Sequence, residues 1–193
     1  MRLAAACVFA ASIVAAGIRT DASADSVAAM RLIDMDGRVW SAGEIRGRVA
    51  LLDFWATWCA PCLVELPYLK RARAQYSRDE LEIIGVSFDV LDRRGFVSWI
   101  NRRRVDWPQV FDGRGRHGPA ARQFGVTAVP TSFLIDAEGK VVGRNLRGEQ
   151  LLAAIDAQVR IARARSPLRV RVDAQRCVTS PAQGASTQPG CRS

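Results

Sequence analysis

A buried strand that runs directly into a helix is the strongest structural signal in this sequence. Residues 49–55 form an apolar run interrupted only by Asp53, which is typical of a strand buried on both faces of a sheet. Apolar residues then recur at helical spacing over residues 62–76. Pro61 suits the first helical turn, because that turn has no use for its missing N–H group. The sequence therefore predicts that a helix starts at Cys59.

Cys59 and Cys62 are separated by two residues at this predicted helix start. Unpaired backbone N–H groups and the helix dipole favour a thiolate there, so we predict that Cys59 is a nucleophile. Cys62 lies one turn further on and is placed to resolve a mixed disulfide. The alternative is a pair of buried thiols or half of a zinc site. Zinc needs four ligands, and Cys177, Cys191 and His117 form no second pair.

The first 24 residues have the pattern of an export signal. Met1 and Arg2 precede an uncharged stretch over residues 3–18, and Ala22-Ser23-Ala24 matches a cleavage site. We expect a signal peptide over residues 1–24, with an uncleaved membrane anchor as the alternative. Export to the periplasm or beyond places the thiols in an oxidising compartment. A dithiol that donates electrons there needs a membrane electron donor to keep it reduced.

The chain is strongly basic, with a formal net charge of +9, and all but two of its 28 basic residues are arginines. These arginines are scattered along the sequence, and export removes nucleic acid as a reasonable partner. We therefore expect a solvated basic surface. Residues 102–104 and 169–171 are the candidates for peripheral contact with anionic lipid headgroups or an acidic partner.

The order of predicted elements indicates a single α/β domain over residues 25–164. The pattern predicts a hairpin within residues 30–40, buried strands at 49–55 and 81–88, helices at 93–104, 119–124 and 149–164, and a second hairpin from 132–135 and 141–146. Residues 165–193 lose this periodicity and form a tail. Its Cys177 and Cys191 pair with each other, remain free, or pair between chains, and their spacing does not decide among these.

Several segments resemble the thioredoxin superfamily, and within it the TlpA, ResA and DsbE group of exported thiol-disulfide oxidoreductases. The resemblance covers roughly residues 27–164 and rests on the segments at 53–62, 65–67, 125–131 and 133–139. It implies a thioredoxin-like fold, with a central mixed β-sheet flanked by α-helices and an N-terminal β-hairpin extension. It also implies that Cys59 is exposed and Cys62 is shielded. We expect a monomer that needs no cofactor.

The resemblance further implies that Pro130 is cis and lies beside the disulfide, although only about 5–6% of X-Pro bonds in folded proteins are cis. A cis Pro130 would present the Val129 backbone to an extended substrate next to Cys59. Trp58 resembles the family's aromatic cover over the disulfide. Trp55 matches this cover as well, with core packing as the alternative. His117 lies in a glycine-rich stretch and is expected to be an exposed loop residue.

Two carboxylates are candidates for moving the proton of the resolving thiol. Asp53 lies in an apolar strand, where burial of its charge raises the pKa. The matching acid of thioredoxins assists the shielded cysteine, whereas many relatives of the TlpA and ResA group carry asparagine there. Glu65 follows Cys62 by three residues, where ResA-like proteins keep a glutamate. A surface carboxylate is the alternative for Glu65, and the division of labour between the two acids stays open.

These patterns together predict an exported thiol-disulfide oxidoreductase that uses the Cys59 and Cys62 dithiol to reduce protein disulfides, for example those of apocytochrome c. A disulfide oxidase or isomerase is the alternative within the same class, because Ala60-Pro61 does not fix the reduction potential. A copper-binding assembly factor that uses the same thiols is the alternative from another class. Its further ligands would be Met30, Met35 and His117, which are distant from the thiols in sequence.

Overall fold

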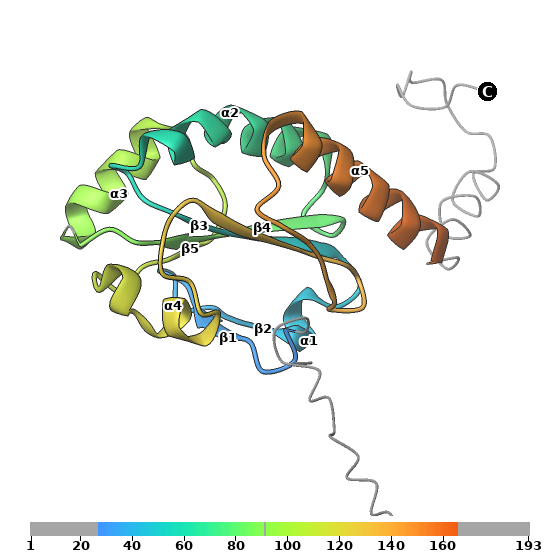
Figure 1. The fold of residues 1–193 in the computed structure, drawn as a ribbon, viewed down its shortest axis with the longest axis horizontal. Coiled ribbons are helices and arrows are strands. Elements are labelled where there is room, and N and C mark those ends of the chain that lie inside the picture. The colour runs from blue at the N-terminus through green and yellow to red at the C-terminus, as the bar shows by residue number, and fades with distance from the viewer. Residues whose placement is uncertain (1–26, 91, 166–193) are drawn as a thin grey trace, which may run out of the picture.

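The computed structural model describes residues 27–90 and 92–165. Its centre is a five-stranded sheet in the order β5-β4-β3-β6-β7 (Figure 1). β3 pairs in parallel with β4 and antiparallel with β6, so the sheet is mixed. The strands are β3 (Val49–Trp55), β4 (Leu81–Ser87), β5 (Gln109–Val110), β6 (Thr131–Ile135) and β7 (Val141–Arg144).

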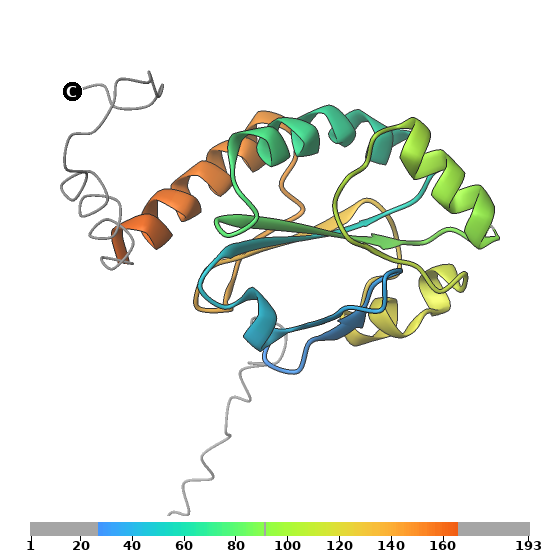
Figure 2. The same cartoon turned by 180° about the vertical axis from the view of Figure 1, so that it is seen from behind.

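Helices cover one face of the sheet, and a hairpin with short helices covers the other (Figures 1 and 2). The first group is α2 (Ala60–Gln75), α3 (Arg93–Arg102) and α5 (Gly148–Arg165). The second group is β1 (Arg31–Ile33), β2 (Val39–Ser41), α1 (Ala42–Ile45), η1 (Gly115–His117) and α4 (Pro119–Gln123). Alternate residues of each strand face opposite layers, so both faces carry apolar side chains.

This arrangement confirms the predicted fold class, including the N-terminal hairpin around Asp36 and Gly37. The short elements β5, α1 and η1 were not predicted, because stretches of two to four residues carry no detectable periodicity. The leader at 1–24 and the tail after Arg165, with Cys177 and Cys191, lie outside the described residues. Among the helices that the structure describes, none is both long enough and apolar enough to cross a membrane.

A buried carboxylate, Asp34, holds the N-terminal hairpin together. Its Oδ1 accepts hydrogen bonds from the backbone N–H groups of Asp36 and Arg38, at 3.0 and 2.9 Å. Its Oδ2 accepts one from the indole Nε1 of Trp40 at 2.9 Å, and Trp40 is fully buried in the core below the sheet. Asp34 therefore links the turn of the hairpin to its largest core side chain.

Replacing Asp34 with alanine should destabilise the fold by about 1–3 kcal/mol, because the buried Nε1 of Trp40 loses its acceptor. Urea unfolding followed by circular dichroism measures this change. Asp36→Ala is the matched control, since Asp36 is an exposed residue of the same turn. It should change the free energy of unfolding by less than about 0.5 kcal/mol. Equal effects of the two substitutions would contradict the assignment.

Candidate active site

The two cysteines lie at the start of α2, as the sequence predicts. Cys59 is the N-cap residue, Pro61 lies in the first turn, and Cys59 and Cys62 form a disulfide. The Sγ atom of Cys59 accepts a hydrogen bond from the backbone N–H of Cys62 at 3.2 Å. An N–H group of the first helical turn therefore points at the sulfur on which a thiolate charge would form.

The expected contrast in exposure between the cysteines is wrong for this disulfide-bonded state. Cys59 and Cys62 are each only 4% exposed. The physical reason is that the disulfide holds the sulfurs together and both residues pack into the core layer that also contains Phe54 and Ala56. Trp58, by contrast, is 65% exposed next to Cys59 in the chain, so it is available for contact with a partner.

Trp55 belongs to the core, as the alternative interpretation of this residue proposed. Its ring packs against Phe96, and its Nε1 donates a hydrogen bond to Oε1 of Gln109 at 3.0 Å. The Gln109 side chain reaches it across Gly85 of β4, where any Cβ would lie only 2.3 Å from Gln109 Oε1. A glycine at position 85 is therefore required for this contact.

Asp89 fixes the turn that leads into Cys59, a role that the sequence analysis missed. Its fully buried carboxylate accepts hydrogen bonds from Thr57 Oγ1 at 2.6 Å, from Thr57 N at 3.0 Å and from Ser87 Oγ at 2.8 Å. Asp89 follows the end of β4, which is parallel to β3. The carboxyl ends of parallel neighbours meet at one edge, and this rule could have indicated the contact.

Asp53 is buried in the middle of β3, opposite Ser132 of β6 and Gly85 of β4. Burial raises the pKa of Asp53 from 3.8 to about 7, because the charged form loses its hydration. The positive charge of Arg147 opposes this rise, and the negative charge of Glu65 adds to it. Asp53 can therefore gain and lose a proton close to neutral pH.

Glu65 lies on α2, one turn after Cys62, and its partner comes from a distant part of the chain. Its Oε2 accepts a hydrogen bond from the backbone N–H of Gly148 at 2.8 Å. Gly148 is the first residue of α5, so the Glu65 carboxylate caps that helix start. The half-buried Glu65 is thus neither a free surface carboxylate nor remote from Asp53, whose pKa it influences.

The peptide bond between Val129 and Pro130 is cis, as the resemblance implied. Both residues are half-buried, and Pro130 directly precedes β6. The carbonyl of Pro130 accepts a hydrogen bond from Nη2 of Arg147 at 2.7 Å.

His117, in η1, is exposed. Within the described residues, no group of three or more His, Cys, Asp or Glu side chains could hold a metal ion.

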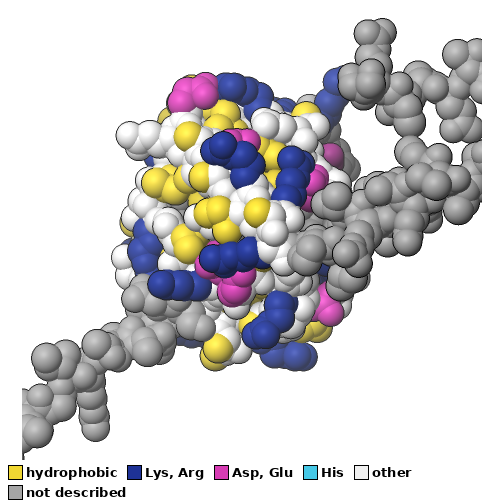
Figure 3. Space-filling model, turned by 90° about the vertical axis from the view of Figure 1, so that its right-hand side faces the viewer, with side chains coloured by type: hydrophobic (Ala, Val, Ile, Leu, Met, Phe, Trp, Pro, Cys, Tyr) yellow, Lys and Arg dark blue, Asp and Glu magenta, His cyan; other side chains and the backbone are white. Residues whose placement is uncertain are grey.

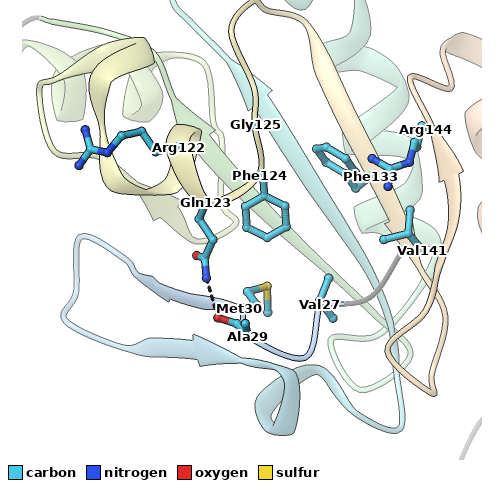
Figure 4. Close-up of a pocket in the computed structure, with 10 residues that line it drawn as sticks. All are labelled: Val27, Ala29, Met30, Arg122, Gln123, Phe124, Gly125, Phe133, Val141 and Arg144. Atoms are coloured by element: carbon cyan, nitrogen blue, oxygen red, sulfur yellow. Dashed lines mark hydrogen bonds between the residues drawn. The ribbon is translucent and has the colours of Figure 1, made fainter. Parts of the chain in front are cut away.

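A separate cavity of about 390 Å³ lies between the N-terminal segment, α4 and the β6-β7 hairpin. Figure 4 shows the rings of Phe124 and Phe133 lining this cavity, and the side chain of Gln123 donating a hydrogen bond to the Ala29 carbonyl. Neither active-site cysteine lines it. The cavity is therefore distinct from the redox site.

Basic side chains are spread over the surface. On the face in Figure 3 they occur in separate groups with acidic side chains beside several of them. Exposed ion pairs such as Arg71 with Glu149 and Arg165 with Glu138 reduce the local excess of positive charge. Residues 102–104 are exposed, whereas residues 169–171 lie outside the described part of the chain. Peripheral membrane contact remains a prediction.

Comparison with known proteins agrees with this geometry. The AhpC/TSA family model matches residues 23–144. The thiol-disulfide oxidoreductase ResA of Bacillus thuringiensis subsp. konkukian is 32% identical over 117 residues, which span 61% of this chain and 65% of that relative. ResA of Bacillus subtilis is 31% identical over 111 residues, covering 58% of this chain and 60% of that relative. The matched part is therefore less than two thirds of each relative.

Solved structures show the same architecture. The thioredoxin domain of a thiol-disulfide oxidoreductase from Bacteroides vulgatus has a TM-score of 0.60 at 29% identity and covers 70% of this chain and 96% of that one. A thiol-disulfide oxidoreductase from Bacteroides fragilis has a TM-score of 0.59 at 30% identity, covering 66% of this chain and 95% of that one. The chain belongs to the AhpC/TSA family and is a thioredoxin-superfamily protein of the TlpA, ResA and DsbE type.

Proposed function

We propose that the protein is an exported thiol-disulfide oxidoreductase that reduces protein disulfides. The Cys59 thiolate attacks one sulfur of a substrate disulfide, so a mixed disulfide forms and one substrate thiolate leaves. The Cys62 thiolate then attacks Cys59, the second substrate thiolate leaves, and the Cys59–Cys62 disulfide forms. The hydrogen bond from the Cys62 N–H to the Cys59 sulfur carries this proposal, because it places a helix-start donor on the nucleophile.

Asp53 is assigned as the group that accepts the Cys62 proton during the second attack, and Glu65 is its charged neighbour. Asp53 and Leu51 are alternate residues of β3, so both face the layer that α2 covers. A carboxyl with a pKa of about 7 is ionised in enough molecules at neutral pH to accept the Cys62 proton, and it gives that proton up readily afterwards. Glu65 adjusts this balance through its own charge.

The substrate contact is assigned to Trp58, Val129 and Pro130. The exposed Trp58 offers an apolar surface beside Cys59, and the Val129 backbone offers hydrogen-bonding groups to an extended chain. Protein disulfides are therefore the proposed substrate class. Apocytochrome c is the example suggested by the family resemblance, and the names of the relatives specify disulfide exchange without a substrate.

The proposed protein is exported, receives its electrons from a donor in the membrane and acts as a monomer. A reductant in an oxidising compartment is converted to its disulfide after each turnover, so it needs electrons from across the membrane. The export pattern of residues 1–24 supports this assignment. The periplasm, or another exported location, is the proposed site of action.

The reduction potential of the Cys59–Cys62 pair tests the direction of electron flow. We expect a value near the roughly −270 mV of thioredoxin, measured against a thiol buffer with Cys177 and Cys191 changed to alanine. A value near the roughly −120 mV of DsbA would instead assign an oxidase. An intermediate value near the roughly −180 mV of protein disulfide isomerase would assign an isomerase.

The reduced Cys62→Ser variant should accumulate a mixed disulfide with a labelled peptide that contains a disulfide, because the resolving thiol is missing. Intact-mass spectrometry under non-reducing conditions measures the adduct on Cys59. Cys59→Ser is the matched control and should give no adduct. The order of attack would be reversed if Cys59→Ser trapped the substrate and Cys62→Ser did not.

Asp53→Asn should increase stability, and the increase should grow with pH. The folded pKa of Asp53 is raised from 3.8 to about 7, so the folded state binds the proton more tightly than the unfolded state. Stability in the wild type therefore falls as pH rises from about 4 to about 7. The Asp53→Asn variant lacks this loss. Above pH 7 its free energy of unfolding should therefore exceed that of the wild type by up to about 4 kcal/mol.

Urea unfolding of the oxidised protein at pH 4, 6 and 8 measures this gain. Asp36→Asn is the control, because Asp36 is exposed and its substitution should give the wild-type pH dependence. A gain from Asp53→Asn that is the same at all three pH values would contradict the raised pKa.

A further inference from the structure

Arg147 lies in the connection between β7 and α5, and its guanidinium is bound on several sides. Nη2 donates a hydrogen bond to the carbonyl of Pro130 at 2.7 Å. Nη1 donates to Ser132 Oγ and to the carbonyl of Leu146, each at 2.8 Å. The half-buried guanidinium therefore has a fixed position beside the proposed substrate segment at the start of β6.

The same guanidinium binds the side chain that lies opposite the buried Asp53. Asp53 and Ser132 are directly opposite each other in the antiparallel pair of β3 and β6, so their side chains share one face. Arg147 is bound to the Ser132 side chain on that face. The next residue, Gly148, donates its backbone N–H to Glu65. The 147–148 segment thus touches the Ser132 side chain opposite Asp53 and the Glu65 carboxylate.

Few other charges face Asp53. Its strand neighbours Gly85 and Ser132 do not ionise, and burial, Arg147 and Glu65 are the causes of its pKa shift. On α5, Glu149 is exposed and paired with Arg71 of α2 at 2.6 Å. Tyr68 of α2 lies beside this segment, with its ring against Gly148. The layer is otherwise apolar, with Leu51, Leu66, Leu134 and Leu151.

The step that depends on this arrangement is the attack of Cys62 on the mixed disulfide. The Cys62 thiol gives its proton to the Asp53 carboxylate, and the resulting thiolate forms the bond to the Cys59 sulfur. The bond between Cys59 and the substrate sulfur breaks, and that sulfur leaves as a thiolate. The step requires an ionised Asp53. Burial and Glu65 both disfavour ionisation, and Arg147 is the group that opposes them.

We propose that Arg147 is a positioning residue whose guanidinium holds the Pro130 carbonyl in place and, through the Ser132 side chain opposite Asp53, stabilises the ionised Asp53 carboxylate. Arg147 thereby joins the substrate segment to the proton acceptor through one rigid side chain. This proposal rests on the proposed function, in which Asp53 accepts the proton of Cys62. A lysine at position 147 would keep the charge and lose the planar set of donors.

Carbon-13 NMR of the Asp53 carboxyl in the oxidised protein tests the effect of charge without any substrate. The titration midpoint of the wild type should lie at about 7. Arg147→Gln should raise it by about one pH unit, since an adjacent arginine lowers the pKa of an aspartate by roughly that amount or more. Arg147→Lys should restore a midpoint close to that of the wild type.

Two further variants test the sign and the specificity of the effect of charge on the Asp53 midpoint. Glu65→Gln should move the midpoint of Asp53 downward, because it removes the negative neighbour. Arg160→Gln removes the same formal charge from an exposed pair with Asp156 on α5 and should leave the midpoint within about 0.2 units. Thermal melting of each variant checks that it is folded. If Arg147→Gln does not fold, Arg147→Met removes the same charge while keeping an apolar stem, and it should raise the Asp53 midpoint by the same amount.

Some results would overturn the proposal. These are an unmoved midpoint in Arg147→Gln, equal upward shifts in Arg147→Gln and Arg147→Lys, or an equal shift in Arg160→Gln. For the catalytic consequence, the pH profile of mixed-disulfide resolution should move in Arg147→Gln by the same amount as the NMR midpoint. An unmoved profile would also count against the proposal.

The failure of the proposed function gives a different result. In that case the wild type would not reduce a peptide disulfide at any pH, while the NMR shifts would still report on Arg147. Conversely, normal reduction by the wild type with unshifted midpoints in the variants would leave the function intact and remove the role of Arg147.

Discussion

The position of β3 at the centre of the sheet determines the geometry of the whole site. β3 pairs along its full length with β4, and along most of its length with β6, and it is buried from Val49 to Trp55. Such a strand cannot shift its register without moving apolar side chains into the wrong layer. The chain leaves the strand through a short turn and enters α2 at Cys59. The reactive sulfur therefore has a fixed position relative to both flanking strands.

Each polar group of the site is then held by a segment that this central strand brings close. Asp89, after β4, binds Thr57 in the turn before Cys59. Arg147, after β7, binds the carbonyl of Pro130 before β6. The site combines one helix start, two strand ends and a proline-containing segment from distant parts of the chain. Only the fold brings them together.

The thiol pair and the central strand could be predicted because their signals are local. The spacing of Cys59 and Cys62 and the apolar run before them lie within one short segment. The partner of Glu65 could not be predicted, because Gly148 lies 83 residues away in sequence. Arg147 likewise could not be singled out, because nothing in the sequence distinguishes it from the many other arginines of this basic chain. The burial of Cys59 depends on packing that spacing alone does not reveal.

Both edges of the sheet are poorly suited to pairing with another strand. β5 is only two residues long, and its outer carbonyl at Gln109 already accepts a hydrogen bond from the N–H of Met35 in the N-terminal hairpin. On the other edge, the pairing of β6 with β7 has an irregular register between Leu134 and Ile135. A protein that handles unfolded, extended chains is at risk of adding them to its own sheet. The Met35 contact therefore leaves the β5 edge with one fewer free carbonyl for such an addition, which lowers the risk of aggregation through this edge.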